Sequence, residues 1–202
     1  MYLQIYILVA IAAYVSFTSW FEKLDRPYTE QRQIAFTRSI ANLAILGMIS
    51  VPLTYMGFAD LPHNDDNPLW KDILFIGVWG VSTATIFSIT HYALHSKLLW
   101  PIHKQHHQNN PSYSTSCLDA HPLEFLFGNV LAVGLPLYIW VGSEPASLLW
   151  IVYAMFNTVW GHAVEGEHKI HHMRFRWNYG AQPMFIFDKM MGTYKAKLSE
   201  KE

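Results

Sequence analysis

The chain has 202 residues, of which 51% are hydrophobic and only 14% charged, and its formal net charge is -1. About a quarter of the residues of an ordinary soluble domain are charged, so this composition indicates a membrane protein. The near-neutral charge excludes a basic surface for nucleic acid, and the single cysteine, Cys117, excludes an intramolecular disulfide. We expect Cys117 to be an ordinary packed thiol, because no second cysteine supports a redox or metal-binding role.

Five apolar stretches follow one another along the chain and predict about four to five membrane helices. They cover residues 2–21, 39–58, 73–94, 125–141 and 146–162. The first and third have the roughly 20 residues that a spanning helix needs. The second contains Asn42, Gly47 and Pro52, and the last two are short, so these three either span with kinks or form a hairpin that dips partway into the bilayer. We interpret the first stretch as a retained helix, because no Lys or Arg precedes Lys23.

The basic residues are distributed unevenly between the loops. Lys71 is the only one in the loop 59–72, which holds four aspartates instead, at Asp60, Asp65, Asp66 and Asp72. By the positive-inside rule the N-terminus lies outside, and the clustered histidines lie on the cytoplasmic side of the endoplasmic reticulum or of a bacterial inner membrane. His63 is alone in the outer loop, and we expect it to be a solvated turn residue.

Ten of the eleven histidines fall between His91 and His172 with the spacing of metal ligands. They are His91-x-x-x-His95, His103-x-x-His106-His107, His121, His162 and His168-x-x-His171-His172. Residues three and four apart share one face of a helix, so each H-x-x-H-H turn aims its imidazoles at one point. Ten neutral imidazoles are too many for one ion, and five per metal leave a position for oxygen on each.

Imidazole suits iron, copper, zinc and nickel, so the ligand type leaves the metal open, while the ligand number and a lipid-facing site favour a redox-active iron pair. A carboxylate-rich di-iron bundle needs Glu-x-x-His twice, and the chain has it once, at Glu165-x-x-His168. No His-Glu-x-x-His zinc-protease motif occurs. A haem-binding membrane cytochrome would pair histidines across helices inside the bilayer, which the H-x-x-H-H turns fit badly. Taken alone, His121 and His162 are equally explained as interfacial polar residues.

From Thr90 to Tyr194 the chain resembles the fatty acid hydroxylase superfamily, particularly the branch of sterol C-5 desaturases, C-4 methyl sterol oxidases and sphingolipid hydroxylases. The matching residues are His91-Tyr-Ala-Leu-His95, Leu99-Trp100, His103-Lys-Gln-His106-His107, His121-Pro122-Leu123-Glu124, His168-Lys-Ile-His171-His172-Met-Arg-Phe, Asn178-Tyr179-Gly180 and Asp188-Lys-Met-Met-Gly192-Thr193-Tyr194.

The resemblance implies a membrane stem under a cytosolic helical cap that holds two non-haem irons, with zinc as a substitute in purified protein. The metals would activate O₂ with electrons from a reductase or a b-type cytochrome and oxidise a C–H bond of a sterol, fatty acyl or sphingolipid substrate. Carried over by motif, the ligands would be His91, His95, His103, His106, His107, His168, His171 and His172, with His162 as a ninth and His121 as a tenth candidate. Asn178, Tyr179 and Asp188 would either orient the imidazoles or form a tight turn.

We therefore expect an all-α integral membrane protein of one domain, 1–202. Membrane helices occupy 1–95, a first histidine cap segment 96–124, a membrane hairpin 125–162, and a second cap segment with the tail 163–202. The expected reaction is the O₂-dependent hydroxylation or desaturation of a lipid. The alternative is an accessory membrane subunit of a larger complex that retains the fold, since Tyr92 follows His91 where the family commonly has Arg. The aromatic side chains of residues 125–140 and 150–160 either line a binding slot for an acyl chain or sterol, or pack against the membrane and neighbouring helices.

Overall fold

The computed structural model describes residues 3–22, 29–57, 61–181 and 185–198. Helices account for 72% of the described residues, which contain no strand, so the predicted all-α class is confirmed. Asp60, which entered the orientation argument, lies outside the described residues, and no membrane is present in the structure. The side of the membrane on which the histidines lie therefore stays a prediction.

Long helices form the stem of the molecule. They are α1 (Leu3–Phe21), α2 (Glu30–Tyr55), α3 (Leu69–Leu94), α7 (Glu144–Ala163) and a continuous rod made of α5 (Pro122–Glu124), the π-helix η3 (Phe125–Val130) and α6 (Leu131–Ile139). Short elements gather at one end as a cap: α4 (Trp100–His103), the 3₁₀ turns η1 (His106–Gln108) and η2 (Ser114–Ser116), α8 (Glu167–Met173) and α9 (Ile186–Met191).

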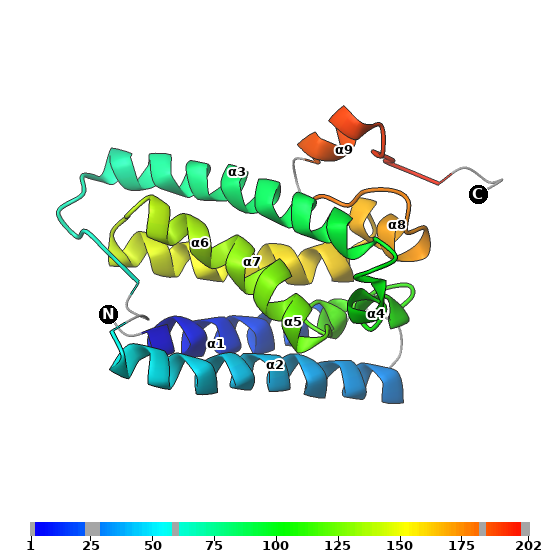
Figure 1. The fold of residues 1–202 in the computed structure, drawn as a ribbon, viewed down its shortest axis with the longest axis horizontal. Helices are drawn as coiled ribbons and strands as arrows, with labels where there is room; N and C mark the ends of the chain where they lie inside the picture. The colour runs from blue at the N-terminus through cyan, green and yellow to red at the C-terminus, as the bar shows by residue number, and fades with distance from the viewer. Residues whose placement is uncertain (1–2, 23–28, 58–60, 182–184, 199–202) are drawn as a thin grey trace.

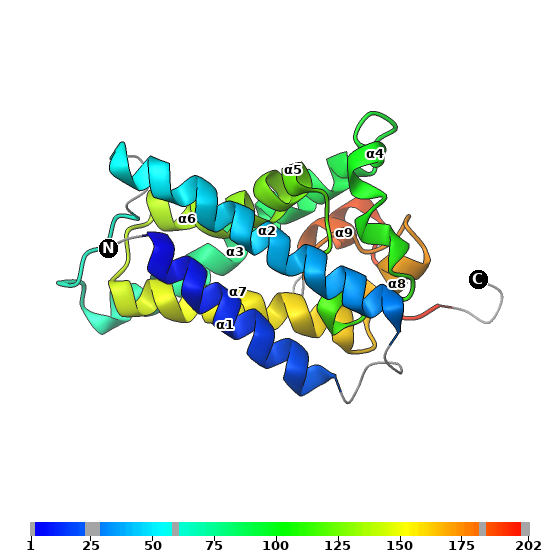
Figure 2. The same ribbon diagram turned by 90° about the horizontal axis from the view of Figure 1, so that it is seen from below.

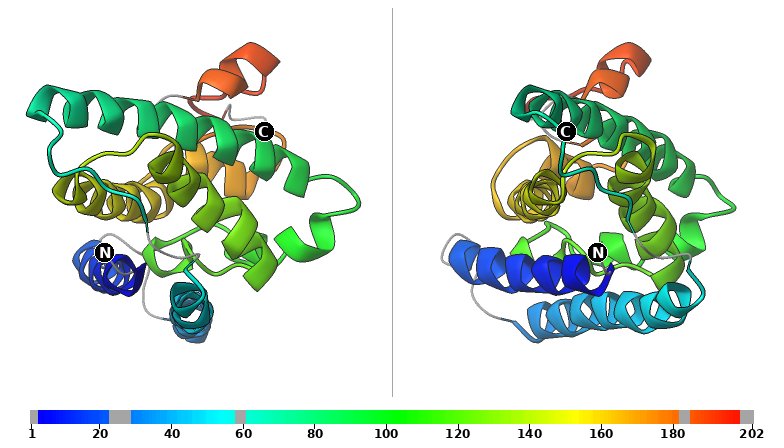
Figure 3. Two further views of the ribbon diagram at one scale, coloured as in Figure 1. Left: turned by 60° about the vertical axis from the view of Figure 1, so that its left-hand side comes forward. Right: turned by 90° about the vertical axis from the view of Figure 1, so that its left-hand side faces the viewer.

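The stem has three layers, with α3 on one side, α6 and α7 in the middle, and α1 and α2 on the other side (Figure 1). Figure 2 shows α1 and α2 running beside each other, and both views of Figure 3 keep α6 and α7 between them and α3. The described N-terminal end of α1 lies at the end of the stem opposite to α4 and α8 (Figure 1). All cap elements therefore lie at the same end of the bundle.

Four helices are long and apolar enough to cross a membrane: Leu3–Phe21, Glu30–Tyr55, Leu69–Leu94 and Pro122–Ile139. Large apolar side chains on their outer faces are exposed, among them Leu8 at 64%, Met48 at 67% and Ile73 at 62%. Such faces are stable against lipid tails and unfavourable in water. Trp20 and Trp70 lie near helix ends, where indole rings favour the membrane interface. The helices thus fit an integral membrane protein.

The second and third spanning helices begin earlier than the apolar stretches predicted. The helix expected from residue 39 begins at Glu30, because the Thr29 side chain accepts a hydrogen bond from the Arg32 N–H and caps it. It then runs through Asn42, Gly47 and Pro52 as one helix that is long enough to span the membrane. Hydropathy finds the part of a helix inside the bilayer, whereas a capping residue determines where the helix starts.

Polar side chains of α1 and α2 point inward and hold the segment that leads into the cap. The hydroxyls of Tyr14 and Ser39 both donate to the Thr115 carbonyl, at 2.9 and 3.1 Å. Asn42 donates to the carbonyls of Leu118 and Ala120 at 3.0 and 2.9 Å. These bonds satisfy buried carbonyls that have no helical partner, and they fix the 115–120 segment against the stem.

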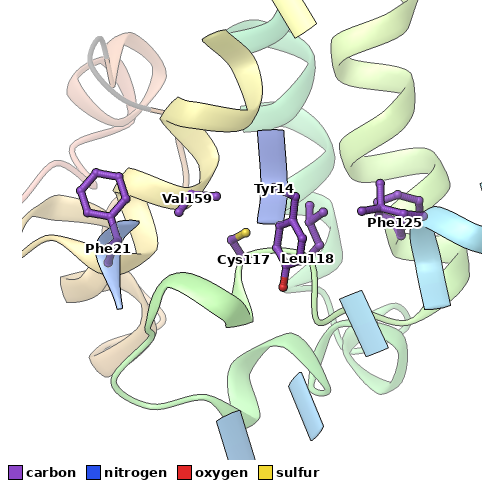
Figure 4. Packing of buried hydrophobic residues seen from close by; sticks show 8 residues of the cluster. Tyr14, Phe21, Cys117, Leu118, Phe125 and Val159 are labelled. Atoms are coloured by element: carbon purple, nitrogen blue, oxygen red, sulfur yellow. The ribbon is translucent and has the colours of Figure 1, made fainter. Parts of the chain in front are cut away.

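Cys117 is part of this segment and lies in an apolar cluster with Tyr14, Leu118 and Phe125 (Figure 4). Its side chain is buried, which confirms the prediction of a packed cysteine. A second cluster closes the far end of the stem around Trp79 and Trp150. Its polar anchor is Asp72, which accepts hydrogen bonds from the Ser143 N–H and hydroxyl at the start of α7.

Candidate metal centre

Nine of the ten clustered histidines come together in two groups at the cap end of the stem. The first group is His91, His95, His103, His107 and His171, and the second is His106, His162, His168 and His172. Within each group one nitrogen of every ring lies within 4.8 Å of the corresponding nitrogen of every other ring. Each H-x-x-H-H turn therefore supplies histidines to both groups, which have five and four rings. The prediction that a turn aims its imidazoles at one point, with five per metal, is wrong.

Helix geometry explains how the first group is assembled. His91 and His95 lie one turn apart at the C-terminal end of α3, and His103 and His107 follow on α4 and η1. The Nε2 atoms of His91 and His103 lie 3.1 Å apart, and those of His95 and His171 lie 3.0 Å apart. In the second group Nε2 of His162 lies 3.3 Å from that of His106 and 3.1 Å from that of His168.

The opposite ring nitrogens are held by acceptors, which decides the tautomer. Five rings have such a partner for Nδ1: the carbonyls of Tyr179 for His91 (2.7 Å), Asp119 for His106 (3.3 Å), Thr158 for His162 (2.8 Å) and Trp177 for His171 (2.6 Å), and Oε1 of Glu124 for His103 (2.8 Å). A carbonyl only accepts, so Nδ1 carries the proton and Nε2 presents its lone pair to the group. This is the arrangement that metal-ligating imidazoles need.

The ring nitrogens of His172 give an independent sign that the groups fit a cation. The side chain is fully buried, and neither of its nitrogens has a hydrogen-bond partner among the residues that the structure describes. An unpaired buried polar group costs roughly 1–3 kcal/mol. A metal ion at the second group would satisfy one of these nitrogens. The donor set, nitrogen throughout, suits iron, copper, zinc or nickel.

Burial keeps the imidazoles of the cap neutral. It lowers the pKa of His103 to about 3, and burial together with nearby His103 lowers the pKa of His95 to about 3. For His168, burial and the neighbouring His106 lower the pKa to about 3. Neutral rings are the form that binds metal, so both groups are ready for a cation near pH 7.

The structure does not bring His121 to either group. Its ring caps α5 instead, where Nδ1 accepts a hydrogen bond from the Leu123 N–H at 3.2 Å. His63 lies in the loop at the other end of the stem, beside the Leu61 carbonyl and Asp65, as expected of a turn residue. His162, the other histidine that was ambiguous alone, belongs to the second group.

Asn178, Tyr179 and Asp188 close the cap over the first group. The buried Asp188 carboxylate accepts hydrogen bonds from the N–H groups of Tyr179 and Gly180, each at 2.7 Å, and so fixes the carbonyl that holds His91. Asn178 adopts a positive φ of 55° and bonds to the backbone of Lys195 and Glu167. The geometry fits the interpretation that these residues orient an imidazole, because Asp188 holds the backbone of Tyr179, whose carbonyl contacts His91.

Glu124 is the site residue whose role sequence reasoning missed. It is 4% exposed, and its Oε1 accepts a hydrogen bond from His103. Its place in His121-Pro-Leu-Glu124, directly after the first cap segment, was the available signal. The carbonyls that hold the other rings left no signal, since every residue has one.

An apolar cavity of about 910 Å³ leads from the histidines into the stem. His91, His103, His106, His162 and His168 line its cap end, so both groups face it. Leu3, Tyr6, Leu61 and Trp150 line its far end. From Ile76 to His91 the wall formed by α3 is about 22 Å long at the helical rise per residue, compared with roughly 15 Å for one leaflet of the hydrocarbon core.

Comparison with known proteins gives one match. The sequence model of a family described as fatty acid hydroxylase matches residues 76–193, which is more than half of the chain. No curated protein and no solved structure matches the chain. The matched range begins in α3 and ends after α9, so it contains every histidine of both groups.

Proposed function

Because the chain belongs to the fatty acid hydroxylase family, we propose that it hydroxylates or desaturates a C–H bond of a membrane lipid with O₂. The observation that carries this proposal is the cavity, which is apolar along its length and ends at both histidine groups. A lipid chain in this cavity would bring a C–H bond to the histidines without entering water. The substrate class is a fatty acyl, sphingolipid or sterol molecule taken from the bilayer.

Two iron ions are the cofactor that we propose, held by the five rings of the first group and the four of the second. When bound, they would supply the activation of O₂. Redox chemistry requires iron rather than zinc, although zinc would fill the same nitrogen sites in a purified protein. The chain's own contribution is to fix the rings: Tyr179 and Trp177 through their carbonyls and Glu124 through its carboxylate.

The walls of the cavity position the substrate and exclude water. Phe87 and Leu94 of α3 and Phe125 of the π-helix line the cavity near the histidines. Their apolar side chains keep water from the reacting carbon, which protects a reactive oxidant from side reactions. Electrons come from a reductase or a b-type cytochrome, and the protein acts in the endoplasmic reticulum or a bacterial inner membrane with its histidines on the cytoplasmic side.

Single histidine substitutions with a matched control test this proposal. His106→Ala removes one of four nitrogen donors from the second group and His171→Ala one of five from the first. We expect each to lower metal content and to abolish the oxidised lipid product. His121→Ala removes a cap histidine outside both groups and should change neither. Metal analysis of the purified proteins, with mass spectrometry of cell lipids, reads both effects. Full activity of His106→Ala and His171→Ala would refute the proposal.

A further inference from the structure

The first histidine group has two different sides. Its inner side meets the cavity at His91 and His103. On the outer side two aromatic rings cover His107: Phe175 with its centroid 4.5 Å away, and Trp100, which stacks on it at 5.6 Å and 26°. Phe175 and Trp100 also contact each other at 5.4 Å. The cavity and the aromatic cover therefore meet different imidazoles of the first group.

This cover reaches the surface of the cap. Phe175 is 37% exposed, so a single ring separates solvent from His107. In the part of the chain that the structure describes, the ring–ring contacts of the second group are with other histidines, and no Phe, Tyr or Trp ring covers it. The outer side of the first group is thus the place where a partner protein can come nearest to a histidine that we assign as a ligand.

The surface around the cover carries charge of one sign. Four exposed basic residues lie within four positions of Trp100 or Phe175 in the sequence: Lys97, Lys104, Arg174 and Arg176. Residues 95–118 and 168–187 contain no Asp or Glu. Leu98, 83% exposed, adds an apolar contact beside Lys97. We call Lys97, Leu98, Trp100, Lys104, Arg174, Phe175 and Arg176 the basic aromatic patch.

The proposed reaction needs electrons from outside the chain. Hydroxylation places one oxygen atom of O₂ in the C–OH bond and reduces the other to water, which consumes two electrons and two protons. Desaturation reduces both oxygen atoms to water with two hydrogens of the lipid and the same two electrons and two protons from outside. Electron transfer slows steeply with distance, so the donor has to dock where the path to the ligands is short.

Resting on the proposed function, we infer that the basic aromatic patch is the docking surface for an acidic one-electron carrier protein. A negative partner surface complements the lysines and arginines and is steered toward them. Its redox group would then face Phe175 and Trp100. An anionic membrane surface would also attract the lysines, but it gives no reason for the exposed ring over His107. The inner side of the group stays free for the lipid.

A charge-reversal pair tests the surface. The full-length protein in nanodiscs of neutral lipid is mixed with an acidic plant-type [2Fe–2S] ferredoxin, and Kd is measured with metal-loaded and metal-free protein. We expect Lys97→Glu with Lys104→Glu to weaken binding by about 10-fold or more at low salt, and the difference to shrink at high salt. Lys189→Glu with Lys197→Glu is the control, because both lysines are exposed on the cap but lie on α9 and the tail, away from α4 (Figure 1).

A second variant separates docking from electron entry. Phe175→Leu keeps an apolar side chain but removes the ring next to His107. At saturating ferredoxin, where docking is complete in both proteins, we expect metal reduction to be slower than in the parent protein. Equal reduction by dithionite in the two proteins would show that the metal centre itself is intact.

Two results would overturn the inference. One is an unchanged Kd after reversal of Lys97 and Lys104. The other is a reversal that weakens binding only to vesicles of anionic lipid, which would assign the patch to the membrane. Failure of the proposed function has its own signature: dithionite-reduced, metal-loaded protein would form no oxidised product from lipid extract, whatever the outcome of the binding measurements.

Discussion

Replacing Ala84 with phenylalanine should turn α3 into a barrier for long substrates. Gly77, Ala84 and His91 are spaced by seven residues, or about two turns, so they lie on one face of α3, and all three line the cavity. Ala84 lies about 10 Å from the level of His91 along the helix axis and Gly77 about 21 Å. A phenyl ring at either position would block the cavity at a known depth.

The depth can be converted into a chain length. An extended chain advances about 1.2 Å per bond, so Ala84→Phe leaves room for roughly eight carbons beyond the reacting one and Gly77→Phe for roughly seventeen. Because the bilayer is as apolar as the cavity, the loss appears in the positioning of the reacting carbon rather than in partitioning. A displacement of about 1 Å can cost around 100-fold, and we expect kcat/KM of longer chains to fall by at least that factor in Ala84→Phe.

The assay compares a series of acyl chain lengths with each variant. Gly47→Phe is the matched control, because a Cβ at Gly47, as at Gly77, meets nothing within 4 Å, but Gly47 does not line the cavity. The control should keep the parent profile, Gly77→Phe should lose only the longest chains, and Ala84→Phe should lose the medium chains as well. Identical profiles for the two cavity variants, or equal damage in the control, would refute the assignment of the cavity to the substrate.

Three further outcomes follow from the site. The pKa of His95, His103 and His168 is lowered to about 3, so these rings stay neutral in the folded metal-free protein but take up protons when it unfolds. The free energy of unfolding is therefore full above about pH 6.5 and falls as the pH drops toward 3, by about 2 kcal/mol per histidine at pH 5. Unfolding midpoints from pH 7.5 to 5 measure this loss, and a flat profile would contradict it. Asp188→Asn should destabilise the cap by about 1–3 kcal/mol and weaken metal binding, because the new amide group places an N–H donor against the N–H groups of Tyr179 and Gly180. Chemical denaturation and metal titration measure the two effects, and unchanged values would show that the carbonyl of Tyr179 is held by other contacts. Glu124→Ala should lower metal affinity by about 10- to 100-fold and Glu124→Gln by less, since the amide oxygen can still accept a hydrogen bond from His103. Metal titration measures both, and equal curves for the two variants would show that Glu124 does not act through this hydrogen bond.

The sequence predicted the parts of this protein that depend on periodicity. The apolar stretches located the stem helices, and the histidine spacing selected eight of the nine residues that the structure brings together. His121 shows the limit of spacing alone, since a histidine just before Pro122 can cap a helix as readily as it can join a cluster. The sequence did not separate His121 from His162, and only the fold shows that His162 joins a group while His121 does not.

What could not be predicted depends on contacts between distant segments. The division of each H-x-x-H-H turn between two groups requires knowledge of how α4, α7 and α8 meet. The carbonyls of Tyr179 and Trp177 reach His91 and His171 through the fold of the backbone, which side-chain identity does not encode. The aromatic cover of His107 likewise joins Trp100 to Phe175, 75 positions later in the chain.

The division of the histidines between the two groups has a consequence for biosynthesis. Each group combines histidines that come before the hairpin of α5 to α7 in the sequence with histidines at its end or after it. A nascent chain that stops at His107 therefore holds four rings of the first group and one of the second. Neither group is whole until α7 has been inserted into the bilayer and α8 has left the ribosome. The metals that we propose can therefore meet complete groups only after insertion.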